Sequence, residues 1–184
     1  LMYNGGSYSP FYSPYRDVCL YGEKGSKVIE NKRTILRNLR FQHAPGVGYG
    51  KRGDFFDAHL LKEGAVFTKE GQAINNISEN DSLLLISYLN SSLVQYLLSL
   101  YAGQHKASGY INLLPLPSRL ETPEIFSIIK IKRESFLWDE TCLESHLLIS
   151  ELLLPSLKES IFSFNLKILE KQARYEELIL SLIH

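Results

Sequence analysis

The longest apolar run of the chain is Ser82–Tyr101, near the middle of the sequence. Its apolar residues occupy most of a helical circumference, which is typical of a helix buried on several sides. Ser78 and Asp81 stand at the spacing of a capping box just before the run, and Gly103 follows it, so we predict one helix from there to the end of the run. Polar residues such as Asn90 interrupt the run at mid-depth, which favours a buried helix over a membrane span.

Strand-sized segments precede this helix. Val47–Lys51, Phe55–Leu61 and Ala65–Thr68 each have the length of a strand, and the glycines between them mark turns. Lys27–Arg40 mixes apolar and basic residues in a pattern that predicts a short basic helix. Together with the central run, these segments predict an α+β fold, in which a small mixed or antiparallel sheet packs on the buried helix.

Two further segments are expected to be extended. Asp17–Tyr21 is a short strand candidate that ends at Gly22. Ile111–Leu114 is apolar and strand-like, and Pro115 and Pro117 fix an extended exit after it.

Residues 119–184 predict a helical C-terminal extension of a first domain, which we place at residues 1–118. Beyond Pro155, residues at spacings of three and four form the pattern of a helical pairing seam with one polar position. The seam consists of Ile161, Phe164, Ile168, Lys171, Tyr175, Leu178 and Leu182. A spacer or pairing helix explains this pattern, and a helix packed on its own domain explains it nearly as well.

Charge is divided unevenly between the two regions, although the formal net charge is zero. Residues 1–118 hold 12 Lys and Arg against 9 Asp and Glu, whereas residues 119–184 hold 8 against 11. The basic excess is concentrated between residues 24 and 52, where only Glu30 is acidic. A field of this sign suits phosphate backbones, and a solvated face of an ordinary protein is the alternative explanation.

The sequence carries no specific catalytic or metal-binding motif. The glycines of Gly46–Gly53 imitate a dinucleotide-binding fingerprint, but no helix pattern opens after them. The five histidines have no metal-ligand spacing. Asp54 and Asp57, three residues apart on a predicted strand, are expected on opposite faces. Cys19 and Cys142 are far apart, which indicates unpaired thiols in a reducing compartment.

The order of several short motifs resembles one protein family. In chain order, the motifs are Gly5-Gly6-Ser7-Tyr8-Ser9-Pro10, Gly46-x-Gly48-Tyr49, Gly64-Ala65-Val66-Phe67 with Gly71, Leu89-Asn90-Ser91-Ser92, Gly109-Tyr110-Ile111-x-x-Leu114-Pro115-Leu116-Pro117 and, more loosely, Phe136-Leu137-Trp138-Asp139-Glu140-Thr141. This order resembles the target-recognition region of large bacterial adenine-specific DNA methyltransferases. The family includes the PglX-type enzymes of phage-exclusion systems and the fused type IIG restriction–modification enzymes.

The resemblance implies the DNA-reading part of a two-part enzyme. In the family, a catalytic domain binds S-adenosylmethionine, flips an adenine out of the duplex and methylates its exocyclic amine with an Asn/Asp-Pro-Pro-aromatic motif. No two prolines are adjacent here, so we expect a non-catalytic fragment of a longer protein, without a cofactor or metal of its own. Its expected partners are double-stranded DNA, the methyltransferase catalytic domain or subunit, and a second copy if the C-terminal seam pairs. The bacterial cytoplasm, away from membranes, is its expected location.

Candidate DNA contacts lie in the basic stretch and in two polar loops. Basic side chains position a protein on phosphates, whereas Arg or Lys reads guanine and Gln or Asn reads adenine. The candidates are Lys32, Arg33, Arg37, Arg40, Gln42, His43, Lys51, Arg52, Gln104, His105 and Lys106. We favour Lys51 with Arg52, between two strands, and the loop 104–106 after the apolar run. A helical protein-interaction module without DNA binding is the alternative function.

Overall fold

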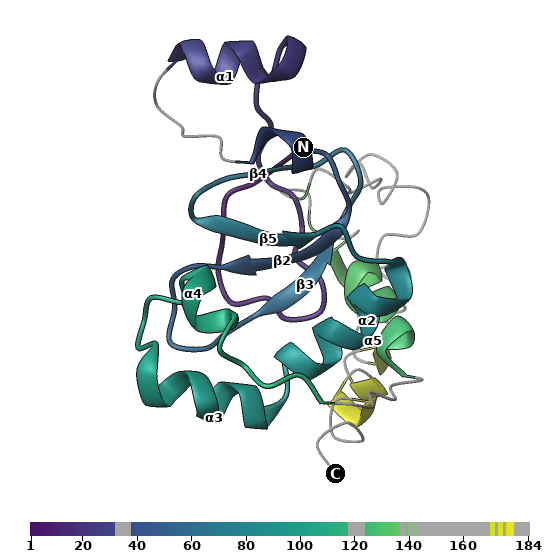
Figure 1. Cartoon of the computed structure of the whole chain (residues 1–184). Coiled ribbons are helices and arrows are strands. Elements are labelled where there is room, and N and C mark those ends of the chain that lie inside the picture. The colour runs from purple at the N-terminus through teal and green to yellow at the C-terminus, as the bar shows by residue number, and fades with distance from the viewer. Residues whose placement is uncertain are drawn as a thin grey trace, which may run out of the picture.

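The computed structural model of the chain describes residues 1–31, 38–117 and 124–136, together with Asp139, Cys142 and residues 170–171, 173–174 and 176–178. Within these residues the chain is an α+β protein, as its sequence predicts (Figure 1). A three-stranded antiparallel sheet forms its centre. Helices pack against one face of this sheet, and the N-terminal segment crosses the other.

The central strand of the sheet is β2 (Gly46–Gly50). It pairs antiparallel with β3 (Ala58–Leu61) on one side and with β5 (Gly71–Asn75) on the other. A separate parallel pair joins β1 (Met2–Tyr3) to β4 (Val66–Phe67). The three strands that the sequence predicts between residues 47 and 68 correspond to β2, β3 and β4, whereas β1 and β5 are not among its predictions.

The register of the sheet separates two apolar layers. Val47 lies opposite Leu60 and Ile74, and these side chains face the helices. Gly48 and His59 are also paired, and they face the other way because a strand alternates its faces. A side chain on Gly48 would meet the Nε2 atom of His59 at 2.7 Å, so this glycine makes room for the buried His59 ring.

The helices are α1 (Ser26–Asn31), α2 (Glu79–Leu89), α3 (Ser92–Tyr101), α4 (Ser108–Ile111) and α5 (Ile125–Phe136), and two short 3-10 turns lie at Glu23–Gly25 and Leu39–Phe41. The described residues between 170 and 178 are also helical. The α2 helix lies on β2 and β3, where it buries Ile86 and Leu89. The α1 helix stands away from this body (Figure 1).

The central apolar run forms two helices, so the prediction of one continuous helix is wrong. The α2 helix ends at Leu89, α3 begins at Ser92, and the pair is bent by 66°. The side chain of Ser91 caps α3 by accepting a hydrogen bond from the Val94 N–H, which fixes a new helix start at this point. No single described helix is long and apolar enough to cross a membrane, although α2 and α3 taken together have the required length and composition.

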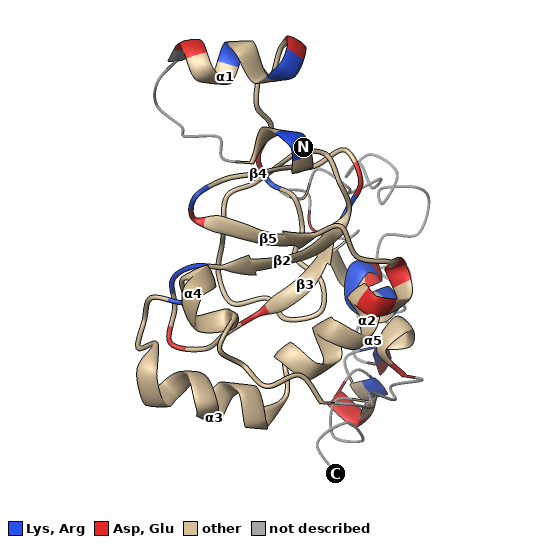
Figure 2. Ribbon diagram, in the orientation of Figure 1, with Lys and Arg blue, Asp and Glu red and all other residues tan. Residues whose placement is uncertain are grey.

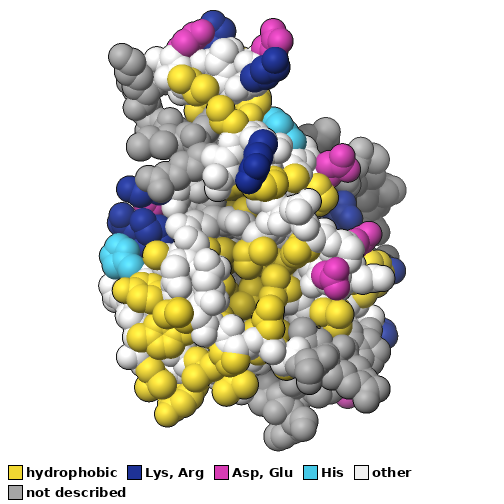
Figure 3. Space-filling view, viewed as in Figure 1, with side chains coloured by type: hydrophobic (Ala, Val, Ile, Leu, Met, Phe, Trp, Pro, Cys, Tyr) yellow, Lys and Arg dark blue, Asp and Glu magenta, His cyan; other side chains and the backbone are white. Residues whose placement is uncertain are grey.

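The α3 helix is buried on one side only, whereas the sequence predicts burial on several sides for the whole apolar run. Val94 and Leu98 face the core, but Leu93, Tyr96 and Leu100 are exposed. The helix contains no charged residue. Its outer face is therefore apolar, and together with α4 it forms a hydrophobic area on one side of the molecule (Figure 3).

Both segments that the sequence analysis expects to be extended differ in the structure. In Asp17–Tyr21 only Asp17 is paired, through a single bridge to Met2. Ile111–Leu114 is the end of α4 and a turn, in which the Leu114 N–H donates to the Ile111 carbonyl at 3.1 Å. The predicted basic helix Lys27–Arg40 overlaps α1 at its start, and residues 32–37 lie outside the described residues.

The α5 helix belongs to the same core as the residues before it. Ile125, Ile128 and Ile129 are buried there, and the Lys132 ammonium donates to the Pro10 carbonyl. Further along the chain, Lys171 forms an ion pair with Glu134 at 2.7 Å. Most of the seam beyond Pro155 lies outside the described residues, so its pairing stays a prediction.

Candidate nucleic-acid interface

The two loops that the sequence analysis favours lie side by side in the structure. The first is the loop between β2 and β3, residues 51–57, which we call the anchored loop. The second joins α3 to α4. The Lys106 N–H donates to the Lys51 carbonyl at 2.7 Å, and the Gly53 N–H donates to the Gln104 carbonyl at 3.2 Å. Residues separated by about 50 positions in the chain are thus joined at one end of the sheet.

Two side-chain amides fix the main chain where the anchored loop leads into β3. Gln95 accepts from the Phe56 N–H at 2.9 Å and donates to the Phe56 carbonyl at 2.6 Å. Asn90 makes the same pair of bonds to Ala58, at 2.9 and 2.7 Å. A carboxamide carries both a donor and an acceptor, so each of these side chains bonds the N–H and the carbonyl of one residue, as a neighbouring strand would. The Leu-Asn-Ser-Ser motif therefore holds the loop with Asn90 and restarts the helix with Ser91.

Asp57 is the third anchor of the loop. Its carboxylate accepts from the N–H of Ser9 at 2.9 Å and from the N–H of Gly50 at 3.2 Å. Burial raises the pKa of Asp57, and these backbone hydrogen bonds oppose the rise. Asp54 is exposed at the tip of the same loop, where it accepts from Gln104 Nε2 at 3.0 Å. The two carboxyl groups therefore occupy different surroundings.

Basic side chains gather where these loops meet. We call the cluster formed by Lys51, Arg52, Lys69 and His105 the basic edge. Figure 2 shows Lys and Arg in the loop after β2, beside α4, and in the turn before β5. The turn lies close because the Lys51 N–H donates to the Glu70 carbonyl at 2.9 Å. In Figure 3 basic and histidine side chains gather at the same side, next to the hydrophobic area of α3 and α4.

The members of the basic edge differ in their bonding. Arg52 forms an ion pair with Glu70 at 2.9 Å, and both side chains are well exposed, so the pair is a weak one. The ammonium of Lys51 has no hydrogen bond or ion pair within the described residues. Lys69 is not among the sequence candidates, because the turn that carries it becomes visible only once β5 is placed beside β2.

Two sequence candidates are buried, so the expectation that they present donors to DNA bases is wrong. Lys106 is 2% exposed, and its ammonium donates to the carbonyls of Gly53 and Gly103. Burial lowers the pKa of Lys106. Gln42 is also buried, and its carboxamide exchanges two hydrogen bonds with the backbone of Phe67, at 3.0 and 3.1 Å. Both side chains instead hold main-chain groups of the fold in place.

Other candidates lie at the opposite end of β2. His43 and Arg40 precede the strand and Lys51 follows it, and five residues of strand separate the two ends by roughly 15 Å. His43 is held by the Gly64 carbonyl at 3.0 Å from its Nδ1 atom, and Arg40 lies over the Phe41 ring. Lys32, Arg33 and Arg37 lie outside the described residues. The basic stretch of the sequence is therefore divided between two places.

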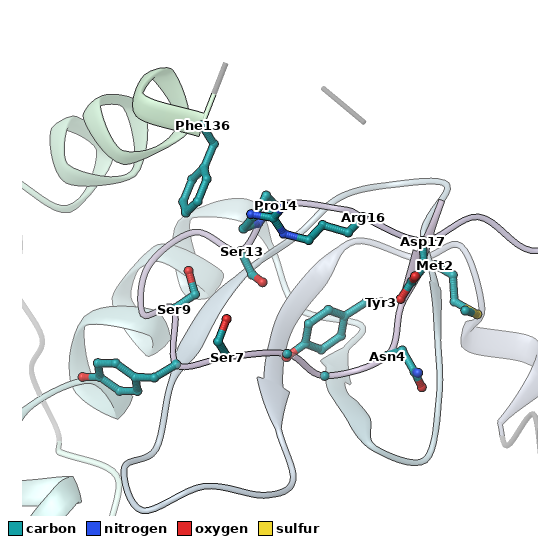
Figure 4. A pocket seen from close by; sticks show the side chains of 13 residues that line it. Met2, Tyr3, Asn4, Ser7, Ser9, Ser13, Pro14, Arg16, Asp17 and Phe136 are labelled. Carbon is teal, nitrogen blue, oxygen red and sulfur yellow. The ribbon is translucent and has the colours of Figure 1, made fainter. Parts of the chain in front are cut away.

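A hollow of about 290 Å³ lies on the N-terminal side of the sheet, between the first 17 residues and Phe136 at the end of α5 (Figure 4). Hydroxyl groups of Ser7, Ser9 and Ser13 line it, together with Tyr3. Its lining residues include no histidine or cysteine, so no nucleophile and base of that kind meet there. Within the described residues, no group of three or more His, Cys, Asp or Glu side chains could hold a metal ion.

The chain matched no model of a known protein family and no curated protein. Three side-chain anchors fix the main chain at the two ends of the anchored loop, at Gly50, Phe56 and Ala58, while Lys51, Arg52 and His105 remain at the surface.

Proposed function

We propose that this chain recognises duplex DNA as the target-recognition domain of a bacterial adenine-specific DNA methyltransferase or restriction–modification enzyme. The meeting of the anchored loop with the loop after α3 is the observation that carries the proposal. Basic side chains of separate loops converge at one edge of the sheet, and main-chain hydrogen bonds together with the half-buried side chains of Gln95 and Asn90 hold those loops in place.

The chemistry of the basic edge suits such a role. Phosphate contacts need accessible cations: Arg52 and Lys69 are exposed, and Lys51 is half-buried with an ammonium that makes no bond within the described residues. Base reading needs a forked donor on a rigid support, because a loosely held guanidinium cannot select one base edge over another. Arg52 meets this requirement, since the residues on both sides of it are bonded to other elements.

The motif order adds support from the sequence. Asn90 and Ser91 have distinct structural tasks at the α2–α3 junction, which gives the Leu-Asn-Ser-Ser motif a physical reason in this fold. Under the proposal, the methyl transfer itself belongs to a separate catalytic domain or subunit that binds S-adenosylmethionine. This chain would supply the DNA-reading part of that enzyme in the bacterial cytoplasm.

Equilibrium binding of the full chain to fluorescein-labelled duplex DNA tests the proposal. We expect binding at low salt that weakens steeply as salt rises, because each phosphate contact releases counterions. The double substitution Lys51→Glu with Arg52→Glu should weaken binding at low salt by at least about tenfold. No binding of the unsubstituted chain at low salt would refute the function.

A matched control reverses two positive charges on another part of the molecule. Lys130 and Arg133 are exposed on α5, away from the loops that form the basic edge. Lys130→Glu with Arg133→Glu should leave most of the affinity in place. Equal losses in both double variants would mean that net charge, and not the basic edge, governs binding.

A protein-interaction module is the second candidate function, and the outer face of α3 favours it. Leu93, Tyr96 and Leu100 are exposed there without a charged neighbour on the helix, and exposed apolar areas of this kind mark interaction sites. Sedimentation of the full chain against Leu100→Glu tests this function. Self-association that the substitution abolishes, in a chain that does not bind DNA, would favour the second candidate.

A further inference from the structure

The anchored loop presents an aromatic side chain to solvent. Phe55 is 64% exposed, whereas its neighbour Phe56 is completely buried. Gln95 holds both backbone groups of Phe56, and the buried ring of Tyr49 lies 5.1 Å from the Phe56 ring. The loop cannot turn Phe55 inward without breaking these contacts. A large apolar ring is thus kept in water by a rigid main chain.

A second exposed ring lies against the first. Tyr8 is 60% exposed, and its ring centroid is 5.9 Å from that of Phe55 at an interplanar angle of 60°. The residue after Tyr8 is Ser9, whose N–H is bonded to Asp57. The same carboxylate accepts from Gly50 at the start of the anchored loop. One buried anchor therefore positions both aromatic residues and the loop that carries Lys51 and Arg52.

The two rings and the cations make a combined surface. Phe55 follows Arg52 by three residues on the same loop, and Asp54 between them is bonded to Gln104 of the adjacent loop. Flat rings beside exposed cations are the combination that binds unstacked nucleotides, because every base has an aromatic face and every nucleotide has a phosphate. Proteins that deform a duplex likewise insert exposed apolar side chains at a base step.

We propose that Phe55, supported by Tyr8, stacks on a base that has left the helical stack of a DNA duplex held at the basic edge. The inference rests on the proposed function, since it requires DNA at this edge. It adds that the chain recognises locally opened DNA through ring stacking as well as through charge. The stacking is independent of which base is presented, because no hydrogen bond to a base edge takes part.

The test compares two fluorescein-labelled duplexes of the same sequence, one fully paired and one with a single-nucleotide 2-aminopurine bulge. The unsubstituted chain should prefer the bulged duplex by about tenfold, because the unstacking cost is already met there. Phe55→Ala should abolish the preference, and Phe55→Trp should keep it. The salt dependence should be unchanged in both variants, because neither removes a charge.

Phe126→Ala is the control, because Phe126 is an equally exposed phenylalanine on α5. It should keep the preference for the bulge. If Phe55→Ala binds both duplexes as the unsubstituted chain does, or if that chain binds both duplexes equally, the inference fails while the proposed function stands. If the unsubstituted chain binds neither duplex, both fail together. If Phe55→Ala changes only the sedimentation of the chain, the rings are a protein contact and the inference also fails.

Discussion

The anchored loop and the α1 arm, which we define as residues 22–31, each carry two basic residues but are held in different ways. The anchored loop and the residues at its two ends are bonded to Asn90, to α3, to the N-terminal segment and to the loop after α3. The α1 arm stands away from the body, and among the residues that the structure describes Lys27 pairs with Glu30 alone, in its own helix at 3.0 Å. The two regions therefore differ in the support beneath their basic residues: several other elements hold the main chain of the anchored loop, whereas the ion pair of the α1 arm is local.

The largest expected effect is a loss of stability in acid caused by His59, which lies in β3 two residues after the anchored loop. Burial, helped by the nearby charge of Lys132, lowers the pKa of His59 from 6.5 to about 3. The unfolded chain therefore takes up a proton that the folded chain excludes. Stability is complete above about pH 6.5 and falls as the pH drops toward 3, by up to about 4 kcal/mol.

Urea unfolding at a series of pH values across this window measures the effect. His59→Gln should give a flatter dependence of the unfolding free energy on pH, even where the substitution lowers the unfolding free energy at neutral pH. His43→Gln, which changes an exposed histidine beside the α1 arm, should follow the unsubstituted chain. A slope that survives His59→Gln would show that another group carries it.

The next effect concerns the amide anchors. Asn90→Ala leaves the N–H of Ala58 without its partner, whereas the Ala58 carbonyl keeps the hydrogen bond from the Phe11 N–H at 2.7 Å. We expect the substitution to cost about 2 kcal/mol of unfolding free energy. Chemical denaturation at neutral pH measures this cost. Asn112→Ala is the control, because Asn112 is exposed after α4. Similar costs for the two substitutions would argue against a special role for the anchor.

A third prediction separates the two basic regions by DNA binding. Lys51→Ala with Arg52→Ala should reduce the slope of log affinity against log salt by about 2, because two phosphate contacts are lost. Lys24→Ala with Lys27→Ala, on the α1 arm, should change the slope by less than half of that. Titrations of a labelled duplex at several salt concentrations measure both slopes. The reverse order would place the interface on the arm.

The smallest effect concerns the surface ion pair of the α1 arm. Lys27 and Glu30 are both well exposed, so Glu30→Gln should change the unfolding free energy by about 0.5 kcal/mol or less. Thermal unfolding at low and high salt measures this change. A larger loss would mean that the arm is coupled to the body, and the contrast with the anchored loop would then disappear.

The sequence predicts the α+β class and the places of β2, β3 and β4, because glycines at the turns and apolar residues between them are local signals. It also predicts the two loops that meet at the basic edge. It does not predict β5, because Gly71, Gln72 and Asn75 weaken the alternation that marks a strand. The strand forms because β2 offers it a partner along its whole length.

The break between α2 and α3 depends on hydrogen-bond partners that are distant in the sequence. The burial of Gln42 and Lys106 depends on such partners as well. An asparagine within an apolar run indicates neither a kink nor an anchor until Ala58 is placed beside it. In the same way, a glutamine or lysine in a polar loop is expected to be exposed, and only the folded chain brings Phe67 and Gly53 within reach. Tertiary bonds of this kind leave no periodic signal in the sequence.

The anchors of the loop bind main-chain atoms. Gln95 and Asn90 bind the N–H and carbonyl groups of Phe56 and Ala58, and Asn90 also donates to the Ile86 carbonyl. Asp57 accepts from the N–H groups of Ser9 and Gly50. The anchors therefore hold the loop without using the side chains of residues 51, 52, 54 and 55, whereas Gly53, with a φ of 138°, is a position that favours glycine. Exchange of these four side chains would alter the chemistry of the surface without breaking an anchor, so new binding preferences can arise here by substitution alone, provided that Gly53, the sheet, the helix junction and the first ten residues are kept.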